Sequence, residues 1–167
     1  MVERLITMLA ICLIVSIGTT AGSTPTPVPG GANQVSAVSG KIGQVIFNGV
    51  LRVQVKELRD ATAADHPEQL LPSAGQKVMI MTVLLKNGSH SDFTDLISYT
   101  LADADEVTFA IPSYMVSPAN LNILQGGAAR QTALFTVDQN YKPTKVIVQC
   151  PSCNSSLGFK AVRFTLP

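Results

Sequence analysis

Two cysteines, Cys150 and Cys153, stand near the end of the chain in the stretch VIVQCPSCNSS. Cysteines at this spacing can form half of a zinc site, a redox-active thiol pair or a small disulfide. These chemistries belong to different compartments, because disulfides persist in oxidising surroundings and are rare in the cytosol. The compartment has to be inferred from the rest of the chain before the pair can be interpreted.

The N-terminal stretch MVERLITMLAICLIVSIGTTAGS has the layout of a secretory signal. Arg4 precedes an apolar run over residues 5–17, and small residues follow it up to Ala21. This order predicts a signal peptide over residues 1–21 and a secreted or otherwise extracytoplasmic protein at the cell surface. The run is shorter than the ~20 residues that span a membrane, so export is favoured. If residues 1–21 are retained, they would instead tether the chain to the membrane.

The stretch after this segment, STPTPVPGGANQVSAVSG, is rich in Pro, Gly, Ser and Thr, and no charge occurs in it before Lys41. Such a composition cannot bury enough apolar surface to offset its ordering entropy, which predicts an extended tether over residues 22–40. The remaining residues, 41–167, have the size of one domain with its own core. Across the chain, 12 basic residues face 11 acidic ones without forming a basic stripe, which disfavours nucleic acid as a partner.

The domain shows the period of β-strands. In VLRVQVKEL, apolar Leu51, Val53 and Val55 alternate with polar residues, as in a strand with one face in a core. KVMIMTVLLKN is apolar on both faces and predicts a central strand that ends at Asn87-Gly88. Further strands are expected in ISYTLAD, VTFAI, ARQTALFTV, KVIVQ and FKAVRFTL. The inward-facing set is predicted to be Leu51, Val53, Val55, Ile80, Leu101, Phe135, Val146, Val148 and Phe164.

Seven or eight short strands separated by turn-rich pieces predict an all-β fold, an antiparallel immunoglobulin-like β-sandwich. The order of KIGQ, PSAGQK, LLKNGS, SYTLADADE and LQGGAARQTALFTV resembles the secreted immunoprotective-antigen type of extracellular immunoglobulin-like domain. That group consists of bacterial and archaeal envelope modules, mostly of unknown function. The chain departs from it at Gln125, where the group often has proline, and at Glu106, where it often has glycine. The resemblance covers residues 41–167 and implies a fold, not a catalytic site.

Export and the turn geometry favour a disulfide between Cys150 and Cys153. Without Cys12, which lies in the predicted signal, two cysteines remain. A four-residue turn brings its end α-carbons within about 7 Å, which overlaps the separation that a disulfide needs, and Pro151 suits the second turn position. Structural zinc would need four ligands, and the two histidines, His66 and His90, are far away in the sequence. A redox pair would need a cysteine at a helix N-terminus.

Two further stretches contain side chains that could form a chemical site. Asp103, Asp105 and Glu106 in LADADEV are weak calcium candidates, because the stretch lacks the glycine and the later oxygen ligands of a dedicated loop. His90 and Asp92 could contribute to a hydrolytic triad, yet no nucleophile turn of the Gly-x-Ser-x-Gly type occurs. Two Asn-x-Ser patterns, at Asn87 and Asn154, suggest exposed loops.

These observations predict a non-catalytic module rather than an enzyme. We expect an extracytoplasmic interaction or accessory module of the cell envelope, with a protein or envelope component as its partner and without a cofactor. The alternative is a small redox or metal-handling protein centred on the Cys-Pro-Ser-Cys turn.

Overall fold

The computed structural model describes residues 38–65, 72–111, 115–153 and 157–167. Within these ranges the chain forms ten strands and one short 3-10 turn, Ala63–Asp65. No helix that is long and apolar enough to cross a membrane occurs in the described ranges. The strands are β1 Val38–Lys41, β2 Ile46–Phe47, β3 Leu51–Asp60, β4 Gln76–Asn87, β5 Ser98–Ala102, β6 Thr108–Ala110, β7 Val116–Ser117, β8 Ala128–Asp138, β9 Lys145–Gln149 and β10 Val162–Thr165.

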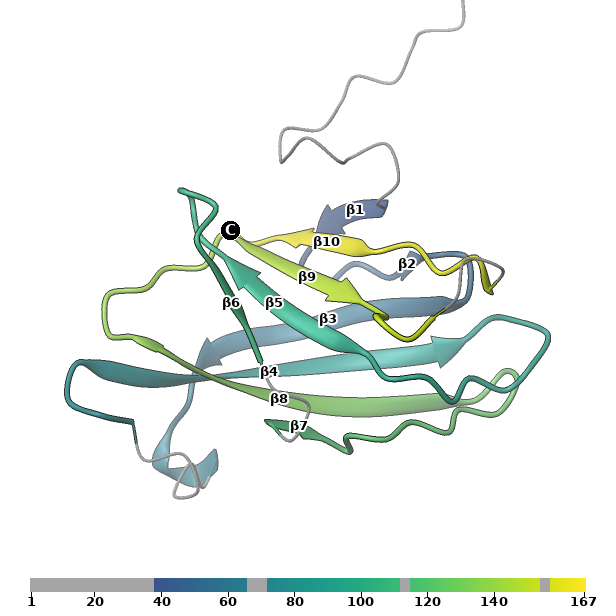
Figure 1. Cartoon of the computed structure of the whole chain (residues 1–167), viewed down its shortest axis with the longest axis horizontal. Helices are drawn as coiled ribbons and strands as arrows, with labels where there is room; N and C mark the ends of the chain where they lie inside the picture. Colours follow the sequence, from purple (N-terminus) through teal and green to yellow (C-terminus); the bar gives the residue numbers. More distant parts are fainter. Residues whose placement is uncertain (1–37, 66–71, 112–114, 154–156) are drawn as a thin grey trace, which may run out of the picture.

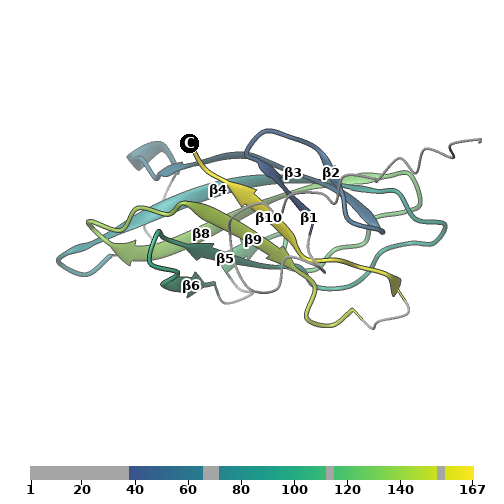
Figure 2. The ribbon, with the colours of Figure 1, turned by 90° about the horizontal axis from the view of Figure 1, so that it is seen from above.

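The strands form two five-stranded sheets packed face to face (Figures 1 and 2). One sheet has the order β1-β10-β9-β5-β6 and the other β2-β3-β4-β8-β7. All neighbours are antiparallel except β1 and β10, which pair in parallel. The orders β3-β4-β8-β7 and β10-β9-β5-β6 correspond to the two sheets of an immunoglobulin-like sandwich. The predicted fold class is therefore confirmed.

The period-two pattern of the sequence places one face of each long strand in the core. In β3, Leu51, Val53 and Val55 are fully buried and their neighbours Arg52 and Lys56 are exposed. A β-bulge after Val55 interrupts the register with β4 and ends this alternation. All nine residues predicted to face inward are buried, eight of them within the central apolar cluster.

Ile80 is the exception, because it does not belong to that cluster. The residues of β4 that face the opposite sheet are Met79, Met81, Val83 and Leu85, which belong to the central cluster. Ile80 lies between them on the other face, paired with Arg59 of β3 and Leu134 of β8. Since β4 is apolar on both faces, its own sequence could not indicate which face meets the second sheet.

Three short strands were not predicted. β1 begins at Val38, within the stretch expected to be a tether, and pairs with the last strand from Val38 to Lys41. β2 and β7 have two residues each and lie at the two edges of their sheet. Strands this short carry no recognisable alternation, so their pairing depends on neighbours that are distant in sequence. The predicted signal segment, residues 1–21, lies outside the described residues.

Two buried polar side chains, Tyr99 and Gln131, form a hydrogen bond between the two sheets within the core. The side chain of Tyr99 on β5 is fully buried, and its hydroxyl donates a hydrogen bond to Oε1 of Gln131 on β8 at 2.5 Å. Nε2 of Gln131 donates to the backbone oxygen of Pro118 at 2.7 Å. Burial raises the pKa of Tyr99 far above its usual value, which keeps the hydroxyl protonated as a donor. These bonds connect the two sheets through the core.

Candidate functional site

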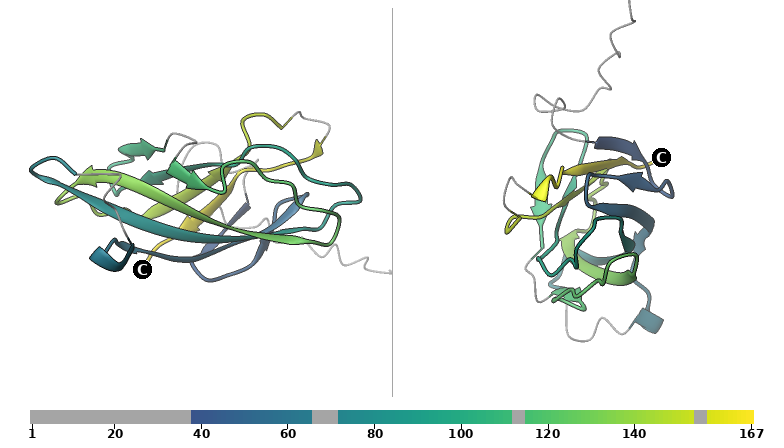
Figure 3. Two further views of the ribbon diagram at one scale, coloured as in Figure 1. Left: turned by 90° about the horizontal axis from the view of Figure 1, so that it is seen from below. Right: turned by 90° about the vertical axis from the view of Figure 1, so that its right-hand side faces the viewer.

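Four connections gather at one end of the sandwich, which is on the right in Figure 1 and faces the viewer on the right of Figure 3. We call this the loop end; it comprises residues 48–50, 88–97, 118–127 and 150–161, of which 154–156 lie outside the described residues. Three of these connections correspond to loops that lie together at one end of immunoglobulin-like domains. Loops on a rigid sandwich are frequent binding sites, which makes this end the first candidate.

The loop end is held together by contacts between its connections. Phe93 and Ile123 exchange two backbone hydrogen bonds of 3.0 and 2.9 Å, which form an isolated β-bridge. Oδ1 of Asp92 accepts a bond from the backbone N–H of Gln125 at 2.9 Å. The rings of Phe93 and Phe159 stack with their centroids 6.3 Å apart. Residues from three connections are thus fixed relative to one another.

Asn87 organises the start of connection 88–97 from a buried position. Its Nδ2 donates to the backbone oxygens of Ser91 and Ile123 at 2.7 and 2.9 Å. Its Oδ1 accepts from the backbone N–H and the hydroxyl of Ser89 at 2.9 and 2.7 Å. The expectation that the Asn-x-Ser pattern places Asn87 in an exposed position is therefore wrong. Only 1% of the residue is exposed, and both its amide nitrogen and its amide oxygen form hydrogen bonds. Asn154 lies outside the described residues.

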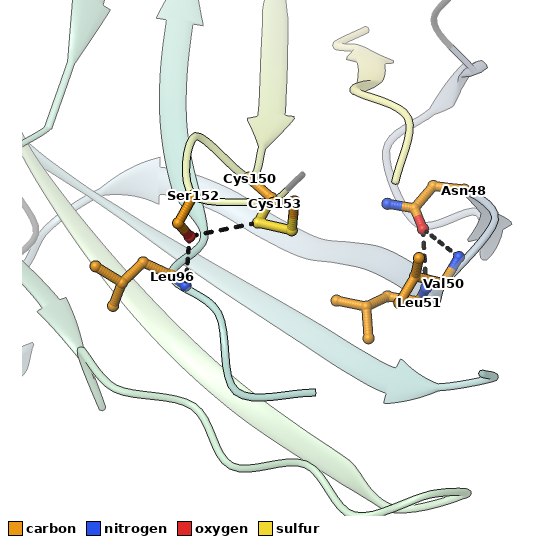
Figure 4. Close-up of a disulfide and its surroundings, with 7 residues drawn as sticks. All are labelled: Asn48, Val50, Leu51, Leu96, Cys150, Ser152 and Cys153. Atoms are coloured by element: carbon orange, nitrogen blue, oxygen red, sulfur yellow. Dashed lines mark hydrogen bonds between the residues drawn. A yellow bond between two sulfur atoms is a disulfide. The ribbon is translucent and has the colours of Figure 1, made fainter. Parts of the chain in front are cut away.

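Asn48 plays a related role in connection 48–50 (Figure 4). Its Oδ1 accepts hydrogen bonds from the backbone N–H groups of Val50 and Leu51 at 3.1 and 2.8 Å. Its backbone oxygen accepts a bond from the N–H of Lys160 at 3.0 Å, which ties this turn to the segment before β10. The residue is fully buried.

Cys150 and Cys153 are joined by a disulfide directly after β9, as the sequence predicts. Their α-carbons lie 5.3 Å apart, and the backbone N–H of Cys153 donates to the oxygen of Cys150 at 3.3 Å. Pro151 and Ser152 are the central residues of this turn, and both are exposed. The covalent bond therefore closes a turn that also has a backbone hydrogen bond.

We expect the double substitution Cys150→Ser and Cys153→Ser to leave the domain folded. A closed loop this small contributes at most about 2 kcal/mol by the chain-entropy estimate, against a typical domain stability of ~5–15 kcal/mol. Thermal unfolding should show one cooperative transition at a temperature only a few degrees lower. Loss of the cooperative transition would contradict a stapling role and indicate a structural centre.

Ser152 connects the cysteine turn to connection 88–97. Its Oγ accepts a hydrogen bond from the backbone N–H of Leu96 at 3.3 Å and lies 3.7 Å from Sγ of Cys150 (Figure 4). Asp95, the residue before Leu96, is thereby placed beside the disulfide. One carboxylate oxygen of Asp95 and the two sulfurs of Cys150 and Cys153 all lie within 4.8 Å of one another.

Asp95 was not predicted as a member of any site. It stands 55 residues before Cys150, in a stretch without a motif, so no local signal points to it. The crossing of the chain from one sheet to the other between β4 and β5 brings it to the cysteine turn.

A small apolar cavity of about 160 Å³ opens next to this cluster. Leu96, Ile111, Val116 and Pro151 form most of its wall. Pockets that enclose small-molecule ligands usually exceed ~300 Å³. The cavity is therefore suited to a single apolar side chain rather than to a metabolite.

A larger but shallow hollow of about 380 Å³ lies beside Tyr141 and Pro167.

The three calcium candidates form a turn between β5 and β6. Oδ1 of Asp103 accepts hydrogen bonds from the backbone N–H groups of Asp105 and Val107 at 3.0 and 2.9 Å. Glu106 forms an ion pair with Lys145 and has a φ of 61°, the left-handed conformation that glycine adopts most easily. The observed contacts account for Asp103 and Glu106 as turn-forming residues.

The remaining sequence candidates are dispersed. His66 lies outside the described residues, and His90 is exposed in connection 88–97. Asp92 accepts the backbone N–H of Gln125, as described above. Tyr141, beside the calcium candidates, donates its hydroxyl proton to the backbone oxygen of Val107 at 3.1 Å. Burial, together with the charge of Asp103, raises the pKa of Tyr141 to about 12.

No protein-family model and no curated protein matches the chain. Among solved structures, a conserved hypothetical protein from Bacillus anthracis is similar with 14% sequence identity and a TM-score of 0.48, over 65% of this chain and 87% of that one. An uncharacterized β-sandwich protein from Clostridium difficile 630 is similar with 9% identity and a TM-score of 0.48, over 77% of this chain and 93% of that one. These are likenesses to uncharacterised bacterial proteins and assign no family.

Proposed function

We propose that the chain is a non-catalytic interaction or accessory module of the cell envelope that binds a protein partner through its loop end. We further propose that it acts outside the cytoplasm and is related to the secreted immunoprotective-antigen type of domain. The observation that carries this proposal is that contacts between its connections fix the loop end, which exposes Leu96 and Leu124 and has a small cavity beside Leu96.

Two leucines make the loop end suitable for a protein surface. Leu124 is 61% exposed and Leu96 is 42% exposed, and Leu96 also borders the cavity. A protruding apolar side chain of a partner could fill a cavity of this size, as an anchor residue does at an interface. Connections that are already fixed lose little conformational entropy on binding, which favours affinity.

The net charge and the predicted extracytoplasmic location of the chain agree with this role. The near balance of 12 basic and 11 acidic residues does not favour nucleic acid or an anionic membrane surface. A signal over residues 1–21 and a tether over residues 22–40 would hold the domain outside the cell or away from the membrane. Small disulfides such as Cys150–Cys153 are typical of exported proteins.

The test is a quantitative capture experiment with two matched variants. The tagged full chain is incubated with the envelope fraction of its own cells, cross-linked, and the recovered partner is measured. Leu96→Ser with Leu124→Ser should reduce recovery at least about tenfold, because truncating an interface anchor costs more than 1 kcal/mol. Val107→Ser is the control, because Val107 is 52% exposed but lies in the β5–β6 turn outside the loop end.

Equal recovery by the double leucine variant and by the wild type would contradict binding through the loop end. The location is tested separately by fractionation and by the intact mass of the native protein. Recovery of the chain in the cytoplasm would contradict an envelope role.

A further inference from the structure

Asp95, Cys150 and Cys153 bring together three side chains of the types that bind divalent metal ions. They come from two connections of the loop end and meet beside the disulfide. We infer that reduction of this disulfide creates a site for a borderline or soft divalent cation of the Zn²⁺ class, with the two thiolates and the Asp95 carboxylate as ligands. These residues lie within the loop end, but the inferred metal site is an additional role that goes beyond the protein binding proposed above.

The spacing of the three ligand atoms is close to that of a tetrahedral site. Zn²⁺ binds sulfur at about 2.3 Å and carboxylate oxygen at about 2.0–2.2 Å, so neighbouring ligand atoms of a tetrahedron lie roughly 3.5–3.8 Å apart. The carboxylate oxygen and both sulfurs lie within 4.8 Å of one another while the sulfurs are still bonded. After reduction the sulfurs need to separate by less than 2 Å to reach the spacing of metal ligands, roughly the change from a bonded pair to a tetrahedral edge.

The cysteine turn has stabilising features besides the S–S bond. The backbone bond from Cys153 to Cys150, 3.3 Å long, does not depend on the sulfurs. Pro151 fixes one backbone dihedral angle at the second turn position. The two thiols of the reduced protein would therefore stay on the same side of a preformed turn.

Asp95 is fixed on both sides along the chain. Phe93, two residues earlier, is 2% exposed, stacks on Phe159 and bonds to Ile123. Leu96, the next residue, donates its N–H to Ser152 within the cysteine turn. These contacts fix the backbone on both sides of Asp95, and the carboxylate lies beside the sulfurs. A metal ion would not have to order a free loop.

Charge explains why a cation is the fitting ligand. Two thiolates and one carboxylate would place three negative charges within about 5 Å, an arrangement that is unfavourable without a counter-charge. A divalent cation compensates most of this charge and displaces the thiol protons. All three residues are half-buried, which leaves access for the ion and for water as a fourth ligand.

The redox step needs an external reductant of the dithiol or phosphine class. A dithiol transfers two electrons and two protons to the disulfide, which breaks the S–S bond, forms two thiols and leaves the dithiol oxidised to its own disulfide. Binding of M²⁺ then releases the two thiol protons. The oxidised chain lacks the two thiolates and should not bind.

The experiment uses the full chain with Cys12→Ser, which leaves Cys150 and Cys153 as its only cysteines. The protein is reduced with a phosphine, which converts to its oxide, and is titrated with Cd²⁺ while thiolate-to-metal absorption is recorded. Zn²⁺ is then added as a competitor. We expect one Cd²⁺ per reduced chain, displacement by Zn²⁺, and no thiolate absorption in the oxidised chain.

Asp95→Asn should weaken Cd²⁺ binding by the reduced chain at least about tenfold, since even residues that only support a metal ligand contribute that much. Asp105→Asn is the matched control and should bind like the wild type. A thermal melt of each reduced variant checks that it is folded. Absence of Cd²⁺ binding by the folded reduced chain, or unchanged affinity in Asp95→Asn, would overturn the inference.

Discussion

Asn87→Asp is expected to lower the free energy of unfolding by about 3 kcal/mol or more, although it exchanges a single side-chain group. The amide nitrogen of Asn87 donates to the backbone oxygens of Ser91 and Ile123. A carboxylate has no proton to donate, so it would face these two oxygens with a negative charge inside the protein. Burial of an unpaired charge adds to the cost of the lost hydrogen bonds.

Chemical denaturation followed by fluorescence or circular dichroism measures this loss directly. The melting temperature should fall by about 10 °C or more. Asn140→Asp makes the same chemical change at an exposed position between β8 and β9 and should be nearly neutral. Equal stability of the two variants would show that the amide of Asn87 does not hold the loop end together.

Tyr99→Ala is expected to remove most of the stability of the domain. Replacing a fully buried aromatic side chain by alanine costs about 3–5 kcal/mol, because the lost contacts and the remaining cavity both disfavour the folded state. The substitution also leaves Oε1 of Gln131 without its donor in the core. Since domains are typically stable by ~5–15 kcal/mol, this loss is a large part of the total, and we expect the melting temperature to fall by more than about 10 °C.

Two further variants separate the packing effect from the hydrogen bond. Tyr99→Phe keeps the ring and removes only the hydroxyl, so it should cost about 1–3 kcal/mol through the unpaired Gln131. Combining it with Gln131→Met removes both polar groups, and the combined loss should be smaller than the sum of the single losses. A Tyr99→Ala variant with the melting temperature of the wild type would exclude a central role for this residue.

The fold could be predicted to the level of its class and its long strands. Alternation in Leu51, Val53 and Val55 is a local property with a period of two residues, and burial of one face of a sheet is its simplest cause. The cysteine turn was predictable for the same reason, because Cys150 and Cys153 are separated by only two residues. Neither prediction needed knowledge of distant neighbours.

The candidate site was only partly predictable, since most of its contacts join residues that are far apart along the chain. Asn87 looks like part of an exposed Asn-Gly turn, yet it is buried and donates a hydrogen bond to the backbone oxygen of Ile123 in a different connection. Gln131 looks like a polar residue in a strand, but its partner Tyr99 lies on the other sheet. The residues next to a polar side chain in the sequence do not show whether its amide is buried and hydrogen-bonded or exposed to solvent.

The sequence by itself determined the strand periodicity, the residues available to the core and the disulfide turn, because each depends on neighbours within a few positions. Only the tertiary structure decided that Ile80 faces away from the opposite sheet and that Asp95 meets the two cysteines. The physical reason is that the chain crosses from one sheet to the other between β4 and β5, so these contacts join residues that are distant in sequence. Which face of β4 is covered, and which loops meet at one end, follows from how the layers pack rather than from any local pattern.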